Sequence, residues 1–256
     1  MIELFAEGKT EEQVIEQLNK RNLCAYKVEI TRNIEGESQM MSKLKLRLKD
    51  WYKIGYVSNI PLTILVMRDL DTDNKKTVQD ICKSTLDCTR NIDFRNGIDS
   101  KAKIEKSTDY DNLYFINTEL KGLNLVLHIA MDQYSNSFTK TTIDDYVLKL
   151  ALSSVMANKL MERHKRIDWT ITPERLISKI ENEIPNLISS NGIKLCEAKD
   201  YARFLASVLR SNLSPQRLAD QVLSYAEEPN IKEVFKALLS AIQFLGDQEL
   251  SVTTDK

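Results

Sequence analysis

The sequence lacks the cysteine and histidine patterns from which zinc sites and disulfide frameworks are built. Its four cysteines, Cys24, Cys82, Cys88 and Cys196, are scattered and form no Cys-x-x-Cys pair. Two histidines cannot complete a zinc site with that spacing. We therefore expect reduced, buried thiols, as in most cytoplasmic proteins.

Long apolar runs and an excess of charge of one sign are also missing. No apolar stretch reaches the roughly 20 residues that a membrane-spanning helix needs. The N-terminus is acidic and its first apolar run is broken at Glu3, so no signal peptide is visible. The sequence thus predicts a cytoplasmic protein without membrane contact. The net charge is −1, so any nucleic-acid surface must be a local basic patch.

The stretch from Leu62 to Asp73 is the most informative part of the chain. An apolar run follows Pro61, which is typical of a buried strand. Acids then occupy alternate positions, at Asp69, Asp71 and Asp73, and alternate residues share one face of a strand. Ligands bind at the carboxyl ends of strands in open α/β sheets. Because crowded carboxylates repel one another, we expect a hard divalent cation such as Mg²⁺ between them.

The N-terminal segment is expected to form the other side of this site. Residues 1–6 form a short apolar strand, which Glu7 and Gly8 follow, and an amphipathic helix then spans about 11–21 with Thr10 as its N-cap. If the two strands are parallel neighbours, Glu7 lies beside Asp69 and Asp71.

The rest of the first half alternates between strands and helices. We expect strands at 25–31, 113–117 and 123–130, a helix at about 75–88, and a loop or flexible insertion at 88–107 around Asn96-Gly97. Residues 39–54 fit a strand or a helix. We interpret them as a helix, because a parallel connection to the acidic strand needs a crossover. Two interpretations stay open for the basic side chains of this segment: contact with phosphate, or a solvated helix face. These residues are Lys43, Lys45, Arg47 and Lys53.

From about residue 142 the apolar residues recur at helical spacing. Helices are predicted at 143–161, 173–188, 197–210, 215–225 and 231–245. The chain thus divides into an α/β domain at 1–132, a helical domain or extension at 133–246, and a disordered tail at 247–256. The two histidines, His128 and His164, are interpreted as structural or exposed rather than catalytic.

Three familiar motifs fit the acidic segments incompletely. Gly8-Lys9-Thr10 looks like the end of a P-loop, but Glu3 stands where that loop needs glycine, so ATP binding is not expected. A calcium loop from Asp69 would need glycine at Asn74. An aspartyl-phosphate phosphatase would use Asp69 as nucleophile and wants threonine at Asp73; this reading stays open as a third possibility.

The two acidic segments together resemble the TOPRIM domain. The resemblance is carried by Phe5-Ala6-Glu7-Gly8-Lys9-Thr10-Glu11 and by Ile64-Leu65-Val66-Met67-Arg68-Asp69-Leu70-Asp71, and it covers roughly the first half of the chain. TOPRIM domains occur in topoisomerases, primases, OLD-type nucleases and small stand-alone proteins of bacterial defence loci. Glu-Gly-Lys-Thr-Glu looks like the OLD-type and stand-alone branch. The resemblance implies a TOPRIM-like, Rossmann-like α/β fold with a mainly parallel sheet flanked by helices.

The resemblance also implies roles for particular residues. The metal ligands would be Glu7, Glu11, Asp69, Asp71 and Glu119. The catalytic residues would be Glu7, Asp69, Asp71 and Lys199. Two of these have simpler readings: Glu11 is favourable near any helix N-terminus, and Lys199 can pair with a neighbouring acid on its helix.

The function implied is a Mg²⁺- or Mn²⁺-dependent nuclease that cleaves DNA or RNA. No tyrosine is marked by a motif as a strand-passing nucleophile, and no zinc-binding segment supports a primase. A defence effector that works with a separate ABC-type ATPase is one form of this reading, because the chain has no P-loop of its own. The competing class is a non-cleaving, Mg²⁺-dependent module that binds nucleic acid or protein, and a homo-oligomer stays open.

Overall fold

The computed structural model describes residues 1–31, 34, 36–71, 76–90, 102–132, 134–135, 138–164, 171–209, 211 and 213–254. Asp73, Asn74 and the Asn96-Gly97 pair lie outside the described residues. The strands are β1 (Ile2–Ala6), β2 (Val28–Ile30), β3 (Leu62–Asp71), β4 (Lys103–Lys106), β5 (Leu113–Asn117), β6 (Leu123–Ala130) and β7 (Lys140–Thr141).

Helices follow most strands of the first half and make up nearly all of the second. The first half contains α1 (Lys9–Lys20), α2 (Glu37–Asp50), the π-helix η1 (Trp51–Tyr56) and α3 (Val78–Arg90). The second half contains α4 (Ile143–Ala151), α5 (Ser154–Arg163), α6 (Pro173–Ser178), η2 (Lys179–Glu183), α7 (Ile184–Ser190), α8 (Ala198–Val208), α9 (Pro215–Tyr225), α10 (Glu228–Val234) and α11 (Lys236–Thr254).

The sheet is mixed but its centre is parallel. The strand order is β2-β1-β3-β6-β5-β4, and β7 pairs with the last residues of β3. The pairs β1–β2, β1–β3 and β3–β6 are parallel, whereas β5 and β4 add an antiparallel edge. The predicted α/β class, with a mostly parallel sheet flanked by helices and a helical C-terminal part, is confirmed.

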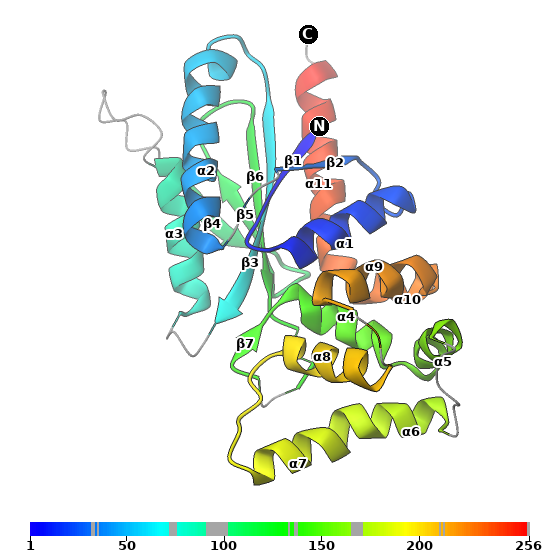
Figure 1. Cartoon of the computed structure of the whole chain (residues 1–256). Helices are drawn as coiled ribbons and strands as arrows, with labels where there is room; N and C mark the ends of the chain where they lie inside the picture. Colours follow the sequence, from blue (N-terminus) through cyan, green and yellow to red (C-terminus); the bar gives the residue numbers. More distant parts are fainter. Residues whose placement is uncertain are drawn as a thin grey trace.

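Side chains of the central strands alternate between two cores. Leu4 and Leu65 join the core under α1 and α11, whereas Phe5, Ile64 and Val66 join the core under α2 and α3. Figure 1 shows α2 and α3 on one side of the sheet and α1 and α11 on the other, with α4–α8 beyond the carboxyl end of β3. This alternation decides which face each charged side chain at the strand ends will meet.

The segment that fitted both a strand and a helix is a helix. Met40, Leu44 and Leu48 of α2 are fully buried against the sheet. Their i, i+4, i+8 spacing gives a helix one continuous apolar stripe, and Trp51 continues that stripe into η1. The alternating lysines therefore lie beside or opposite the buried stripe.

Several predicted boundaries differ from those observed. Helix α1 begins at Lys9 with Gly8 as its N-cap, so Thr10 lies inside the helix and is buried. The predicted strand at 25–31 is shorter, at Val28–Ile30, and β4 lies within the predicted loop at 88–107. The predicted helix at 143–161 is two helices, because the Ser153 side chain caps a new one at Met156 N.

The helical half shares its core with the sheet. One cluster of buried side chains runs from Ile2 and Leu65 to Leu238 and Leu245 of α11, and α11 packs against β6, β3 and β1. Residues 247–254 continue this helix, contrary to the predicted disordered tail. Gly246 lies within α11 rather than at its end. Its missing side chain lets the helix approach the Tyr26 ring. Within the described residues, no helix combines the length and the apolar character that crossing a membrane requires.

Candidate active site

The carboxyl ends of β1 and β3 lie side by side, as the sequence predicts. Ala6 pairs with Met67 in register, so Glu7 lies next to Arg68. The Arg68 guanidinium is 1% exposed and donates from Nε to the Glu7 carboxylate and from Nη2 to the Glu37 carboxylate. Its Nη1 lies 3.2 Å from Ser84 Oγ. Glu7 thus meets Arg68 on the α2/α3 side rather than lying free beside Asp69.

Asp69 points to the opposite face and lies in a second group of acids. Its side chain is 10% exposed, and its Oδ1 atom is buried without a hydrogen-bond partner. Burial raises the pKa of Asp69 well above its usual range, and the Glu11 and Glu7 charges raise it further. Burial, with help from Asp144, raises the pKa of Glu11 to about 7. These acids therefore hold protons far more tightly than exposed carboxyls do.

Asp144 comes from the first turn of α4 and is fixed by that turn. The Thr142 hydroxyl accepts a hydrogen bond from Asp144 N and lies 3.2 Å from Asp144 Oδ2. The neighbouring Asp145 carboxylate accepts from Thr142 N and from Tyr134 N, both at 2.9 Å. Asp145 is thus occupied with capping, and Asp144 is the α4 acid that acts on Glu11.

Two lysines face this group of acids. Lys140 Nζ lies 3.9 Å from Asp69 Oδ2, and Lys199 Nζ lies 3.6 Å from Asp144 Oδ2. Burial lowers the pKa of Lys199, but Asp144, Asp69 and Glu11 raise it more, so its pKa lies above the ordinary value. Lys199 is therefore an ammonium group at neutral pH and a poor proton acceptor. The structure brings it to the acids across 130 residues of chain from Asp69.

Two of the residues named from the resemblance lie differently from the rest. Asp71 ends β3 opposite Lys140 of β7 and is half-buried. Glu119 follows β5, near the start of β6, and Leu123 of β6 pairs with Leu62 at the beginning of β3. Seven residues of strand, about 23 Å, separate Leu62 from Asp69. The expectation that Glu119 joins the metal site does not fit this placement, because β5 is antiparallel to β6.

The predicted basic stripe lies mostly away from the acids. Helix α2 starts at Glu37, beside Arg68, and runs toward the other edge of the sheet, where η1 carries the exposed Lys53. Arg47 forms a two-point pair with Glu3, with Nε at 2.8 Å and Nη2 at 2.6 Å from the carboxylate. Lys43 and Lys45 lie along the same helix and are half-buried. Arg47 is thus engaged in the fold.

The acids fit a divalent cation in part. In the part of the chain that the structure describes, no three His, Cys, Asp or Glu side chains are arranged so as to hold a metal ion. Two local features nevertheless fit one. The Asp69 Oδ1 atom is buried and unpartnered, and a Cβ at Gly8 would come within 2.8 Å of Glu11 Oε2. Oxygen donors alone suit Mg²⁺ or Mn²⁺, and the acids that influence one another here are Glu11, Asp69 and Asp144.

Sequence reasoning missed Arg68, Lys140 and Asp144. Arg68 carried a signal, because an arginine inside a buried strand must be paired with an acid. Asp144 follows Thr142 in a capping sequence and looks like a residue that favours a helix N-terminus. Lys140 carried no local signal, since only the pairing of β7 with β3 brings it to Asp69.

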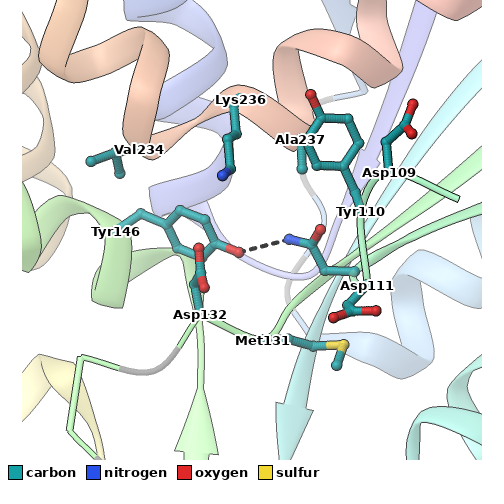
Figure 2. Close-up of a pocket in the computed structure, with 10 residues that line it drawn as sticks. Asp109, Tyr110, Asp111, Met131, Asp132, Tyr146, Val234, Lys236 and Ala237 are labelled. Atoms are coloured by element: carbon teal, nitrogen blue, oxygen red, sulfur yellow. Dashed lines mark hydrogen bonds between the residues drawn. The ribbon is translucent and has the colours of Figure 1, made fainter. Parts of the chain in front are cut away.

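A polar cavity lies next to the start of β5 and the carboxyl end of β6. Its volume is about 330 Å³, and Figure 2 shows Tyr146, Lys236 and Asp132 around it. Asn112 Nδ2 donates to Tyr146 Oη at 3.0 Å and lies 3.3 Å from His128 Nε2. Burial lowers the pKa of His128 to about 4, so its ring is neutral and accepts this bond. The buried side chains of Asn112, His128 and Tyr146 beneath the cavity hydrogen-bond to one another, so we assign them a structural role.

Comparisons with known proteins bear on the fold alone. No family model matches the sequence, and no curated protein matches it. The crystal structure of a hypothetical protein from Pyrococcus horikoshii OT3 is similar, with a TM-score of 0.51 and 16% sequence identity over 98% of each chain. At this identity the likeness concerns the fold alone, which is that of an α/β protein.

Proposed function

We propose that this protein is a divalent-cation-dependent phosphodiesterase with a TOPRIM-like fold that acts on nucleic acid. The observation that supports it most is the unpartnered, buried Asp69 oxygen at a carboxyl strand end, between other acids and two lysines. Mg²⁺ or Mn²⁺, if bound there, would supply Lewis-acid chemistry for phosphodiester hydrolysis. Glu11, Asp69 and Asp144 would hold that ion, with Asp71 at the end of β3 next to them.

The remaining residues of the site take other parts in this proposal. Arg68 fixes Glu7 through one carboxylate oxygen, and Glu7 would act as a general base or acid. Lys199, as an ammonium group, would bind a phosphate oxygen rather than accept a proton. Sequence specificity is not needed for such contacts, because they are made to the backbone of the nucleic acid.

The test is cleavage of plasmid DNA, single-stranded DNA and tRNA by purified protein with Mg²⁺, Mn²⁺ or EDTA. We expect metal-dependent cleavage that Asp69→Asn and Glu11→Gln each remove. Glu119→Gln is the matched control, since it also neutralises one acid but at the other edge of the sheet, and it should cleave normally. If Glu119→Gln and Asp69→Asn lose activity equally, the site is placed wrongly.

A nuclease that stays inactive until a partner ATPase releases it would show no cleavage as purified protein. A separate ABC-type ATPase belongs to the proposal because the chain has no P-loop. The assay is therefore repeated in growing cells, where the wild type should slow growth and Asp69→Asn should not. Equal growth of both, together with no cleavage under any metal, would count against the nuclease.

One observation favours a second candidate, a non-cleaving module that binds nucleic acid. Lys140 and Lys199 already neutralise much of the charge of Asp69 and Asp144, and no three acids in the described residues are arranged around a metal position. In such a module the loss of Asp69 would tighten nucleic-acid binding, because it removes negative charge beside the lysines. A filter-binding comparison of wild type and Asp69→Asn separates the two candidates.

A further inference from the structure

The polar cavity beside β5 and β6 contains a hydrogen-bond acceptor that the fold does not use. Asn112 lines the cavity and is 9% exposed. Its amide nitrogen is occupied, because Nδ2 donates to Tyr146 Oη at 3.0 Å, the bond dashed in Figure 2, and lies 3.3 Å from His128 Nε2. Its carbonyl oxygen Oδ1 has no hydrogen-bond partner among the described residues. The cavity therefore offers a fixed acceptor to a ligand that carries an N–H group.

Lys236 brings a positive charge to the same cavity. It is the first residue of α11, and Figure 2 shows its ammonium group pointing into the space between the Tyr146 and Tyr110 rings. Within the part of the chain that the structure describes, this ammonium group forms no ion pair or hydrogen bond. A ligand with a carboxylate would give it a charge-assisted partner.

Three carboxylates also line the cavity, those of Asp109, Asp111 and Asp132. Asp111 is paired with Lys106 at 2.5 Å, whereas Asp132 lies 3.9 Å from Lys149, beyond hydrogen-bond reach. Asp132 can therefore accept hydrogen bonds from a ligand. This excess of acids would repel a ligand that carries negative charge alone, such as a nucleotide. The lining thus suits a ligand that carries a positive and a negative group together.

We propose that this cavity binds a free α-amino acid. The ligand carboxylate pairs with Lys236, and the ligand ammonium group donates to Asn112 Oδ1 and to Asp132. The cavity volume of about 330 Å³ is sufficient for a small molecule. Apolar surface for the ligand side chain comes from Tyr110, Met131, Val234 and Ala237. The inference goes beyond the proposed function and does not depend on it, because none of these residues belongs to the group of acids around Asp69.

The test is calorimetric titration of the full chain with L-leucine, L-methionine and L-phenylalanine, whose apolar side chains match the lining. Each is compared with its amide, which lacks the carboxylate, and with its deamino analogue, which lacks the ammonium group. We expect at least one of the three amino acids to bind. Its two analogues should each bind at least about 10-fold more weakly, because each loses hydrogen bonds between charged groups.

Two variants assign the two charged contacts separately. Lys236→Met should weaken binding of the amino acid about 10-fold and leave binding of the amide unchanged. Asp132→Asn should weaken binding of the amino acid and leave binding of the deamino analogue unchanged. Both side chains are exposed, so both variants should fold. Lys232→Met is the matched control, since Lys232 lies on α10 and pairs with Glu228 outside the cavity.

Several results would overturn the inference. One is the absence of binding by all three amino acids at millimolar concentration. Another is equal binding of an amino acid and its two analogues, which would assign the ligand to apolar surface alone. Tighter binding of a nucleoside monophosphate than of any amino acid would show that the acids do not select against anions. None of these results bears on the nuclease, and Lys236→Met should keep the wild-type behaviour in the cleavage assay.

Discussion

Arg68 and Asp69 are neighbours in β3, yet their side chains meet different partners on opposite faces of the sheet. Arg68 pairs with Glu7 and Glu37 under α2 and α3, and Asp69 lies with Glu11 and Lys140 on the other side. The strand alternation thus separates a group of acids paired with the buried Arg68 from one with an unpartnered oxygen. The predictions below follow from this separation.

Arg68 should be one of the most sensitive positions in the fold. Arg68→Met leaves Glu7 and Glu37 without their shared cation, and breaking such a buried pair costs about 3–5 kcal/mol of unfolding free energy. Glu37→Gln should cost far less, because Glu37 is 31% exposed. Urea unfolding of both variants measures the difference. Equal losses would mean that the Arg68–Glu7 contact contributes little.

Mg²⁺ should stabilise the wild type by mass action, by about 2.7 kcal/mol when its concentration is 100 times its Kd. Asp69→Asn should lose this gain and be slightly more stable than the wild type without metal, since it removes a buried carboxyl whose ionisation is opposed by burial and by the Glu11 and Glu7 charges. Thermal unfolding with Mg²⁺ or EDTA measures both effects. A shift of equal size in the wild type and in Asp69→Asn would show that the metal binds elsewhere.

The metal-free protein should lose stability as pH rises from about 4.5 to about 7. Glu11 has a pKa of about 7 in the folded protein, raised first by burial, against an ordinary 4.5. In this window the folded state binds more protons than the unfolded state, so stability falls with rising pH. The shift corresponds to roughly 3 kcal/mol.

Glu11→Gln is the variant that isolates this effect. It cannot ionise, so its stability should fall less steeply than that of the wild type between pH 5 and pH 7, as denaturant unfolding at each pH would measure. The comparison with the wild type cancels titrating groups that Glu11 does not influence, such as Asp145, whose pKa burial raises to about 7. Asp69 is not cancelled, because the Glu11 charge contributes to its raised pKa. Parallel curves would place the Glu11 carboxyl in a more polar environment than the structure gives it.

Gly246→Ala tests whether α11 is part of the main core. A Cβ at this position would come within 2.0 Å of the Tyr26 ring, so the helix or the ring must move. We expect a loss of about 1–3 kcal/mol, as for other overpacked sites. Ser240→Ala, on the same helix and half-buried, is the control. Unfolding should stay a single transition in both variants, because one core joins α11 to the sheet.

Local pattern was sufficient for the elements that build the site. The apolar run before Asp69 predicts β3, and a period of two places the alternate acids at its end on one face. The buried stripe of Met40, Leu44 and Leu48 selects a helix over a strand for α2. These conclusions depend only on residues close together in the chain. The adjacency of β1 and β3 does not, because α1, β2 and α2 lie between these strands in the sequence.

Long-range packing decided which charges meet. A register with Ala6 opposite Met67 turns Glu7 toward Arg68, and an antiparallel β5 carries Glu119 to the far edge of the sheet. Asp144, Lys140 and Lys199 reach Asp69 from α4, β7 and α8, through contacts that no local period encodes. A sequence period gives the direction of a side chain within its own element. Partners on other elements depend on how the whole chain closes its shared core.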